Sequence, residues 1–483
     1  MSELAFKSAL QLAAMIRDRK IGALELLEHY LERVERYNPA LNAIVVLDAD
    51  RARARAREAD TALLRGEIWG PLHGVPMTIK ESYDVAGLIT TRGNTIFRDN
   101  RADKDALAVE RLKAAGVTLF GKTNVPLNLA DFQSYNDIYG TANNPWDLER
   151  GPGGSSGGSA AALAAGLAGI ESGSDIGGSI RNPSHYCGVF GHKPTWGLLP
   201  PRGHAAPGVL AESDLTVIGP LARSASDLEI ATLAMAGPDE IHAAGYQLAL
   251  QPSPHRSLGD FKVAVWATDE SAPVNEETQR RVELVAEAIR SAGGVVDHEA
   301  RPAIDIDASH GVYQALLQTV MAARNTDESY AELSAARAAL APGDDSPGAL
   351  LLRAQTASYR DYAAANEART QVRWAWHEFF KEYDAVLMPM MATAAFPHDH
   401  KPMGERTTLV DNDERPYFEQ VFWAGHAVGA YLPSTVIPTG AKGSGLPIGV
   451  QILGPQFGDL QTIGLAKLLE ADGFGFVAPP GYD

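Results

Sequence analysis

The sequence is short of cysteine, of long apolar runs and of basic charge, and each shortage excludes a class of protein. Cys187 is the one cysteine among 483 residues, so no disulfide can form within the chain and no zinc–thiolate cluster can be built. No uncharged apolar run approaches the ~20 residues that a membrane span needs. Lysine and arginine number 42 against 60 aspartates and glutamates, and the net charge of −18 disfavours a nucleic-acid-binding face. We therefore expect neither a nucleic-acid partner nor a membrane partner.

Targeting and cofactor-binding signals are also missing. Residues 1–7 lack a basic stretch ahead of an apolar core, so we expect no secretory signal and a cytoplasmic location. The segment His398-Asp399-His400 could suggest a metal, but two histidines in so short a stretch are more often part of a loop than of a metal site. Residues 116–123 match the nucleotide-binding pattern GxxxxGK[ST], yet the four middle residues are typical of a strand and a proline soon afterwards blocks a helix. We expect no metal and no cofactor.

Apolar stretches of strand length alternate with amphipathic helices along the chain. Residues 23–38 have leucines at helical spacing, and Pro39 is predicted to end that helix. A strand at 261–266 leads into a helix at about 274–292 and then into a second strand at 293–297. Such a strand–helix–strand unit is typical of a mixed α/β fold.

Two serine-bearing glycine loops are the most informative stretches. The first, at 151–160, is Gly-Pro-Gly-Gly-Ser-Ser-Gly-Gly-Ser-Ala and runs into a helix of small residues over 160–168; the second, at 174–181, is Ser-Asp-Ile-Gly-Gly-Ser-Ile-Arg. Glycine lets a backbone take positive φ and approach another chain closely. A loop that feeds a helix N-terminus can hold an anion or a developing oxyanion. A flexible linker would not run into an apolar helix, so the loops predict a site.

The residues alone leave open which serine attacks. Residues 153–157 match GxSxG, the nucleophile elbow of α/β-hydrolases, which would make Ser155 the nucleophile of an esterase. That elbow needs a strand leading into the turn, whereas residues 147–152 are polar and turn-like. The esterase is therefore the weaker alternative.

The runs GGSSGGSAAALAAG at 153–166 and GSDIGGSIRNP at 173–183 resemble the amidase signature family. The resemblance covers most of the chain and is weaker from about 240 to 380. Further matching segments are His73–Pro76, Lys80, Gly121–Pro126, Gly191–Thr195, Gly219–Arg223 and Gly445–Ile452. It implies one α/β domain over 1–483, with a large mixed, twisted sheet covered by helices on both faces. A more variable, largely helical segment is expected at about 305–381.

The resemblance implies a Ser-Ser-Lys triad of Lys80, Ser155 and Ser179, with a cis peptide between Gly154 and Ser155. A neutral Lys80 amine accepts a proton from Ser155, which accepts one from Ser179, and Ser179 Oγ attacks the carbonyl. The implied oxyanion hole consists of the backbone N–H groups of Ile176, Gly177, Gly178 and Ser179. Ser156, Asp175 and Arg181 are expected to support the site, and Leu129, Phe132 and Tyr135 to line the pocket, together with parts of 305–381 and 417–426.

The implied activity is hydrolysis of carboxylic amide C–N bonds through an acyl-Ser179 intermediate, with a small amide and water as partners. Anilides and carbamates are possible substrates, and the chain is expected to be a monomer or a homodimer. The alternative is the glutaminase (A) subunit of a tRNA-dependent amidotransferase, which works only inside a complex. Residues 422–425 and 432–436 look more like the stand-alone hydrolases. A binding module that has lost activity would lack the lysine or a serine. Glu81, where the family often has aspartate, and Leu198, where a basic residue is common, depart from the pattern.

Overall fold

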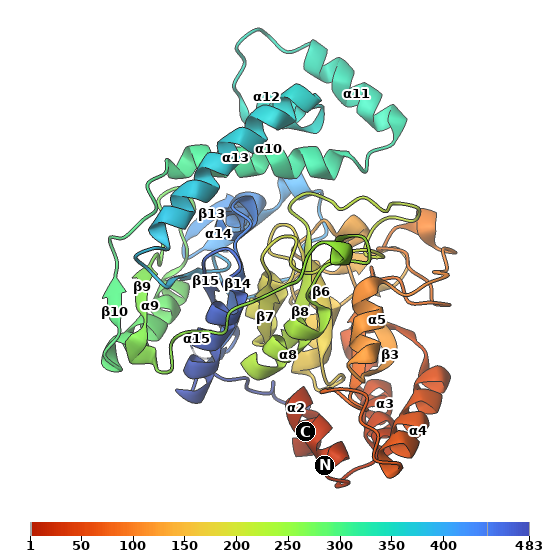
Figure 1. Ribbon diagram of the computed structural model, residues 1–483. Coiled ribbons are helices and arrows are strands. Elements are labelled where there is room, and N and C mark those ends of the chain that lie inside the picture. The colour runs from red at the N-terminus through yellow and green to blue at the C-terminus, as the bar shows by residue number, and fades with distance from the viewer. Residues whose placement is uncertain (1, 442, 483) are drawn as a thin grey trace.

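The computed structural model describes residues 2–441 and 443–482, and its largest feature is an eight-stranded mixed sheet (Figure 1). The order is β10 (Val295–Asp297), β9 (Lys262–Val265), β11 (Ala385–Pro389), β15 (Pro447–Leu453), β14 (Ser434–Ala441), β7 (Phe190–Lys193), β8 (Val217–Ala222) and β6 (Glu171–Asp175). The first three strands pair in parallel, and each later neighbour pairs antiparallel. The strand–helix–strand unit predicted at 261–297 is therefore present at one edge of the sheet.

A three-stranded sheet continues the large one beyond β6. Its order is β1 (Ile44–Leu47), β3 (Thr118–Thr123) and β2 (Pro76–Lys80), with β2 parallel to β3. A single parallel bridge between Met77 and Ile170 joins β2 to the residue that precedes β6. Because β2 and β6 run in the same direction, their carboxyl ends meet at one edge. Six of the eight residues of the nucleotide-like pattern at 116–123 form strand β3, as predicted for its middle residues.

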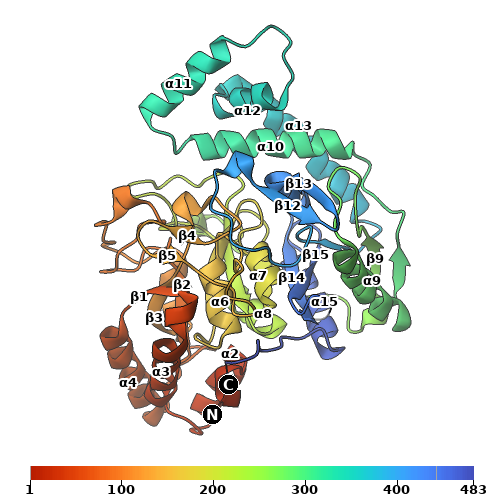
Figure 2. The same ribbon diagram turned by 180° about the vertical axis from the view of Figure 1, so that it is seen from behind.

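Helices cover both faces of the sheet. Figure 1 shows α8 on the near face, and Figure 2, seen from behind, shows α6 and α7 on the other. The helices of this body are α1 (Ser2–Ala5), α2 (Ala9–Arg17), α3 (Ala23–Leu41), α4 (Ala49–Leu64), α5 (Leu107–Ala114), α6 (Gly157–Ala164), α7 (Arg181–Cys187), α8 (Ala225–Met235), α9 (Glu276–Ser291), α14 (Val421–Gly429) and α15 (Asp459–Ala471). Among the residues described, no helix combines the length and apolarity needed to cross a membrane.

A helical excursion stands above the body, within the segment predicted at about 305–381 (Figure 1). It consists of α10 (Ile306–Ala322), α11 (Asp327–Ala338), α12 (Pro347–Gln355) and α13 (Tyr359–Phe379). Two small hairpins complete the fold, β4 (Tyr135–Asn136) with β5 (Gly140–Thr141), and β12 (Thr407–Val410) with β13 (Asp413–Pro416).

One hydrophobic core joins the two halves of the chain. Its largest cluster takes buried side chains from Ala9 to Tyr482, on both sides of residue 250. The predicted single α/β domain with a large mixed sheet is confirmed. One boundary was wrong: α3 continues through Pro39 to Leu41. Because Pro39 lies in the last turn, its missing N–H costs the helix only one hydrogen bond near its end.

Candidate active site

Lys80 is the last residue of β2 and is fully buried. Its Nζ contacts three serine hydroxyls, at 2.7 Å from Ser155 Oγ, 2.9 Å from Ser156 Oγ and 3.0 Å from Ser174 Oγ. An ammonium group can donate to all three oxygens, whereas a neutral amine donates to two and accepts from the third. The arrangement can therefore hold either protonation state.

Burial decides which state Lys80 takes. Removal from water lowers the pKa of the Lys80 amine well below that of a free lysine. Asp175 opposes this shift, while the positive charges of Arg92 and Arg324 add to it. A neutral amine at this position can accept a proton from a neighbouring hydroxyl.

The first glycine loop presents Ser155 and Ser156 at the start of α6. The peptide between Gly154 and Ser155 is cis, as the resemblance implies. Gly154 could not carry a side chain, because a Cβ there would lie 2.3 Å from the carbonyl oxygen of Asp131. Residues 148–156 form no strand, so the strand that a nucleophile elbow requires is absent from this described stretch.

The second glycine loop follows β6 and carries Ser179. Asp175 clamps it, accepting hydrogen bonds from Gly178 N at 2.8 Å and Ile180 N at 3.1 Å. The Gly178 N–H is thus engaged, although the resemblance places it in the oxyanion hole. The N–H groups of Ile176, Gly177 and Ser179 make no hydrogen bond within the described chain. These three are free to receive an oxyanion.

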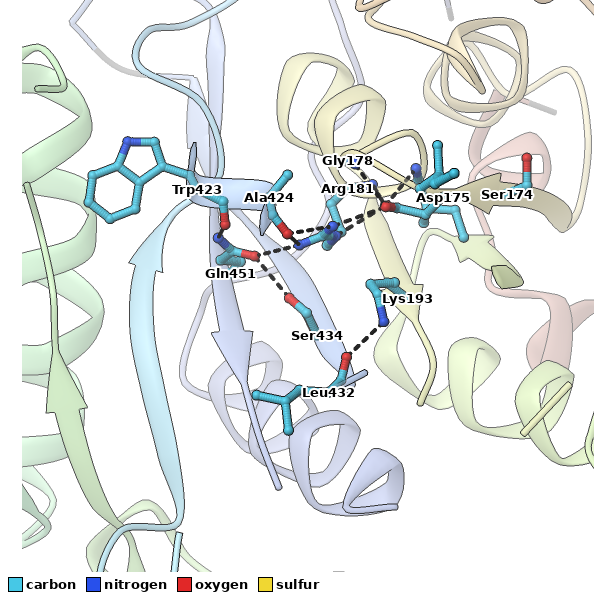
Figure 3. Close-up of polar contacts among 12 residues, drawn as sticks. Ser174, Asp175, Gly178, Arg181, Lys193, Trp423, Ala424, Leu432, Ser434 and Gln451 are labelled. Carbon is cyan, nitrogen blue, oxygen red and sulfur yellow. Dashed lines mark hydrogen bonds and ion pairs between the residues drawn. The ribbon is translucent and has the colours of Figure 1, made fainter. Parts of the chain in front are cut away.

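Asp175 is held by a buried arginine (Figure 3). Arg181 pairs with it at 3.0 Å, and both side chains are fully buried. Burial alone would raise the pKa of Asp175, but the ion pair and the hydrogen bonds of the loop hold it at about 2. Arg181 also donates to the Ala424 carbonyl oxygen and to Gln451 Oε1, which ties the loop to α14 and β15. The Asp175–Arg181 ion pair therefore holds the second loop in a fixed position.

A cavity of about 450 Å³ opens over both loops. Ser155 and Ser179 lie on its wall, together with Ser174, Asp175 and Ile176. The predicted triad residues are therefore brought together, but within the described residues no hydrogen bond joins Ser155 Oγ to Ser179 Oγ. Ser179 is 7% exposed, so its side chain is reachable from the cavity.

The expected pocket residues divide into two groups. Leu129 lines the cavity, and so do Val320, Ala323 and Arg324 at the end of the excursion helix α10. Phe132 and Tyr135 do not: Phe132 packs against Tyr417, and Tyr135 accepts a hydrogen bond from Arg406. None of the described lining residues comes from 417–426. Phe132 belongs to a neighbouring core cluster rather than to the cavity wall.

Sequence reasoning missed several cavity residues. Ser174 contacts Lys80. Its position in the second glycine loop, directly before Asp175, was the sequence signal that could have identified it as a site residue. Arg92 and His204 also line the wall, from segments that carry no recognisable motif. His204 is buried, hydrogen-bonds Ser82 at 2.8 Å, and has a pKa well below that of a free histidine because of burial and nearby positive charge.

The fold, with a buried lysine against two serine-bearing glycine loops, defines a hydrolase of amide C–N bonds. A family model described as Amidase matches residues 25–463, and the chain belongs to that family. A glutamyl-tRNA(Gln) amidotransferase subunit from Acidothermus cellulolyticus is 31% identical to it, over 98% of this chain and 95% of that protein.

Solved structures agree with the family assignment. A structure described as a vestigial protein complex that reveals the origins of an s-triazine catabolic enzyme has a TM-score of 0.82 and 26% identity, covering 97% of this chain and 99% of its own. A bacterial aryl acylamidase of the amidase signature enzymes has a TM-score of 0.81 and 22% identity, covering 99% of each chain, and supports the fold alone.

Proposed function

We propose that this chain hydrolyses carboxylic amides through an acyl-enzyme formed on Ser179. The main support for the proposal is the contact between the buried Lys80 amine and Ser155 Oγ. Ser155 and Ser179 line the same cavity. Because burial lowers the pKa of Lys80, its amine can act as a base at lower pH than a free lysine could.

The first chemical step transfers one proton along two links. Ser179 Oγ attacks the amide carbonyl, its proton passes to Ser155 Oγ, and the proton of Ser155 passes to Lys80 Nζ. Closing the first link needs a rotation of the Ser179 side chain, and catalytic hydrogen bonds commonly tighten only when substrate binds. The backbone N–H groups of Ile176, Gly177 and Ser179 are placed to stabilise the negative charge that develops on the carbonyl oxygen.

The second step returns the proton to the leaving group. Lys80 and Ser155 deliver it to the amine nitrogen as the C–N bond breaks, since an amine leaves poorly as an anion. Water then attacks the acyl-Ser179 ester by the same relay and releases the acid. Ser156 and Ser174 orient the Lys80 amine, while Asp175 and Arg181 hold the second loop.

A fluorophosphonate probe tests the assignment of the nucleophile. We expect it to label the peptide that carries Ser179, and Ser179→Ala to abolish labelling. Labelling of Ser155 in the wild type would contradict the relay and favour an elbow-type esterase.

Whether the chain works alone is a second question, and the relatives favour the alternative. The similar protein from Acidothermus cellulolyticus belongs to an amidotransferase as one of its subunits, and it matches nearly the whole chain. A glutaminase subunit should release ammonia from glutamine only weakly without its partners. A stand-alone amidase, as a monomer or homodimer without nucleic acid, should turn over anilides, primary amides or aryl carbamates by itself. Assaying the purified chain against glutamine and this panel separates the two.

A further inference from the structure

Arg92 is a buried cation that has no counter-ion among the residues that the structure describes. Its side chain lines the cavity of Ser155 and Ser179 and is 5% exposed. Within the described residues its guanidinium makes no hydrogen bond and no ion pair, and its buried Nη1 has no partner. Arginine cannot discharge itself by losing a proton at ordinary pH. A buried unpaired charge is costly, so such a group calls for an anion that the protein itself does not supply.

The backbone holds Arg92 in this place at an energetic cost. The residue has φ of +57°, in the left-handed region that costs a side-chain-bearing residue about 1 kcal/mol. Glu81 fixes this turn, because its carboxylate accepts hydrogen bonds from Thr91 N at 2.5 Å and Arg92 N at 2.7 Å. The glutamate that departs from the family pattern therefore positions the loop that carries Arg92. Left-handed residues with side chains cluster at functional sites.

The neighbouring acids do not neutralise the Arg92 guanidinium. Glu81 and Asp84 attract it, but neither forms an ion pair with it. The other charged residues of the wall are occupied elsewhere: Asp175 by Arg181, Asp214 by Arg369, and Arg202 by Glu110 and Glu240. Glu212 is exposed and interacts electrostatically with Asp239 and His242 rather than with Arg92. Burial lowers the pKa of Arg92 to about 10, and Arg324 adds to that shift, so the group is still cationic at neutral pH.

Arg324 adds a second positive charge at the mouth of the same cavity. It follows α10 and donates to the Asn128 carbonyl oxygen at 3.0 Å, which ties the helical excursion to the cavity wall. Its guanidinium forms no ion pair with a described carboxylate. On the described wall of the cavity, two arginines thus lie near the candidate nucleophile without forming an ion pair.

We propose that the substrate is an amide that also carries a free carboxylate, and that Arg92 binds that carboxylate while Ser179 attacks the amide. This rests on the proposed amidase function and names its substrate class. The planar fork of one guanidinium matches a carboxylate in two parallel hydrogen bonds. A cavity of about 450 Å³ has room for the short monoamide of a dicarboxylic acid.

A pair of substrates of equal shape tests this. In succinyl p-nitroanilide a carboxylate stands where 4-methylpentanoyl p-nitroanilide has an isopropyl group. We expect the wild type to prefer the succinyl compound in kcat/KM by about 10- to 100-fold, the range that a hydrogen bond to a charged group supports. Arg92→Met should abolish this preference, mainly through a higher KM for the succinyl compound. Arg92→Lys should retain part of it.

Arg202→Gln is the matched control. It removes a positive charge from the same wall, but one already paired with two glutamates, so the preference should stay. Wild-type enzyme that treats both compounds equally, or an Arg92→Met enzyme that keeps the preference, would overturn the proposal. Preference for the 3-phosphonopropionyl analogue over the succinyl compound would also overturn it, because the site would then be built for a phosphonate.

Binding separates this proposal from the catalytic one. In Ser179→Ala, succinamate should bind in calorimetry at least 10-fold more tightly than 4-methylpentanamide, and adding Arg92→Met should remove the difference. If the wild type hydrolyses no amide but this binding difference is present, the amidase function fails and the anion site stands. If amides are hydrolysed and the binding difference is absent, the anion site fails alone. Thermal unfolding of Arg92→Met, compared with Arg92→Lys, identifies a variant that has lost its fold.

Discussion

Lys80→Met is the sharpest test of the proposed relay. Methionine has nearly the length of lysine without its amine, so the core volume at the end of β2 is kept. The change removes the group that takes the proton of Ser155 and later supplies the proton of the leaving amine. We expect amide kcat to fall by about 10²- to 10⁴-fold, the usual contribution of a general acid–base.

The leaving group gives a second, internal comparison. A p-nitrophenyl ester releases a phenolate that leaves without a proton, whereas an anilide with the same acyl group needs one. Lys80→Met should therefore reduce turnover of the ester less than turnover of the anilide. Equal loss on both would show that Lys80 acts only before the tetrahedral intermediate breaks down.

The same substitution has a predictable effect on stability. A lysine in water has a pKa of about 10.4, so holding its amine neutral at pH 7.5 costs about 4 kcal/mol. Lys80→Met removes this cost but leaves hydroxyls of Ser155 and Ser174 without their partner, at about 1 kcal/mol each. The variant should be more stable than the wild type by about 2 kcal/mol near neutral pH.

The pH dependence of folding stability tests whether Lys80 is neutral in the folded protein. Between the lowered pKa of folded Lys80 and about 10.4, the unfolded chain binds one proton more than the folded chain, so wild-type stability rises with pH by about 1.4 kcal/mol per unit. The stability difference between variant and wild type should shrink as pH rises through that window, as measured by denaturant unfolding at several pH values. A difference that does not change with pH would refute a neutral Lys80.

Activity of the wild type should also rise with pH through the lowered pKa of Lys80. His204 is the control because it lies on the cavity wall and has its own lowered pKa. His204→Ala should leave the acidic limb of the kcat/KM profile in place. Loss of activity in His204→Ala, together with amide turnover retained in Lys80→Met, would assign the base to histidine instead.

The second loop and the cavity wall support three more predictions. Asp175→Asn leaves Arg181 buried without a counter-ion and should destabilise the protein by about 3–5 kcal/mol in urea unfolding. In the wild type, the stability that Asp175 contributes is present above about pH 4 and is lost as the pH falls towards its folded pKa of about 2. Gly178→Val puts a Cβ 2.7 Å from Met390 Cε at a φ of +108°, so it should displace the neighbouring Gly177 and Ser179 N–H groups and lower kcat about 10²-fold. Gly311→Ala, with open space around it, should not lower kcat. Arg92→Met removes a positive charge that lowers the pKa of Lys80, so the acidic limb for a neutral substrate should move to higher pH; an unmoved limb would place Arg92 too far away to act on Lys80.

Local sequence signals predicted the parts of the site that depend on backbone conformation. The glycines of 151–158 and 177–178 indicated two tight loops, since few other residues can pass so close to a neighbouring backbone. Lys80 ends the apolar stretch Val75–Ile79, and a lysine at the end of such a strand is expected to be buried, as the structure shows. The alternation of helices and strands predicted the mixed α/β domain.

The cavity wall could not be predicted, because it is assembled from segments far apart in the chain. Arg92, His204 and Arg324 meet there although more than a hundred residues separate each from the next. Phe132 and Tyr135 follow Leu129 closely, yet they turn into a core cluster with Tyr417 and towards Arg406. Gly178 looked like an oxyanion donor until the fold brought the Asp175 carboxylate onto its N–H.

The junction of the two sheets explains why a lysine can act as a base here. β2 and β6 run in parallel, so Lys80 and Ser174–Asp175 arrive at the same edge, where the Ser155 loop begins α6. This places the Asp175 carboxylate near Lys80, and an unopposed carboxylate would raise the lysine pKa and keep the amine charged. Arg181 takes up both oxygens of that carboxylate and is itself held by Gln451 and Ala424. The ion pair therefore does more than stiffen a loop: because Arg181 occupies Asp175, burial and the positive charges of Arg92 and Arg324 hold the pKa of Lys80 well below that of a free lysine.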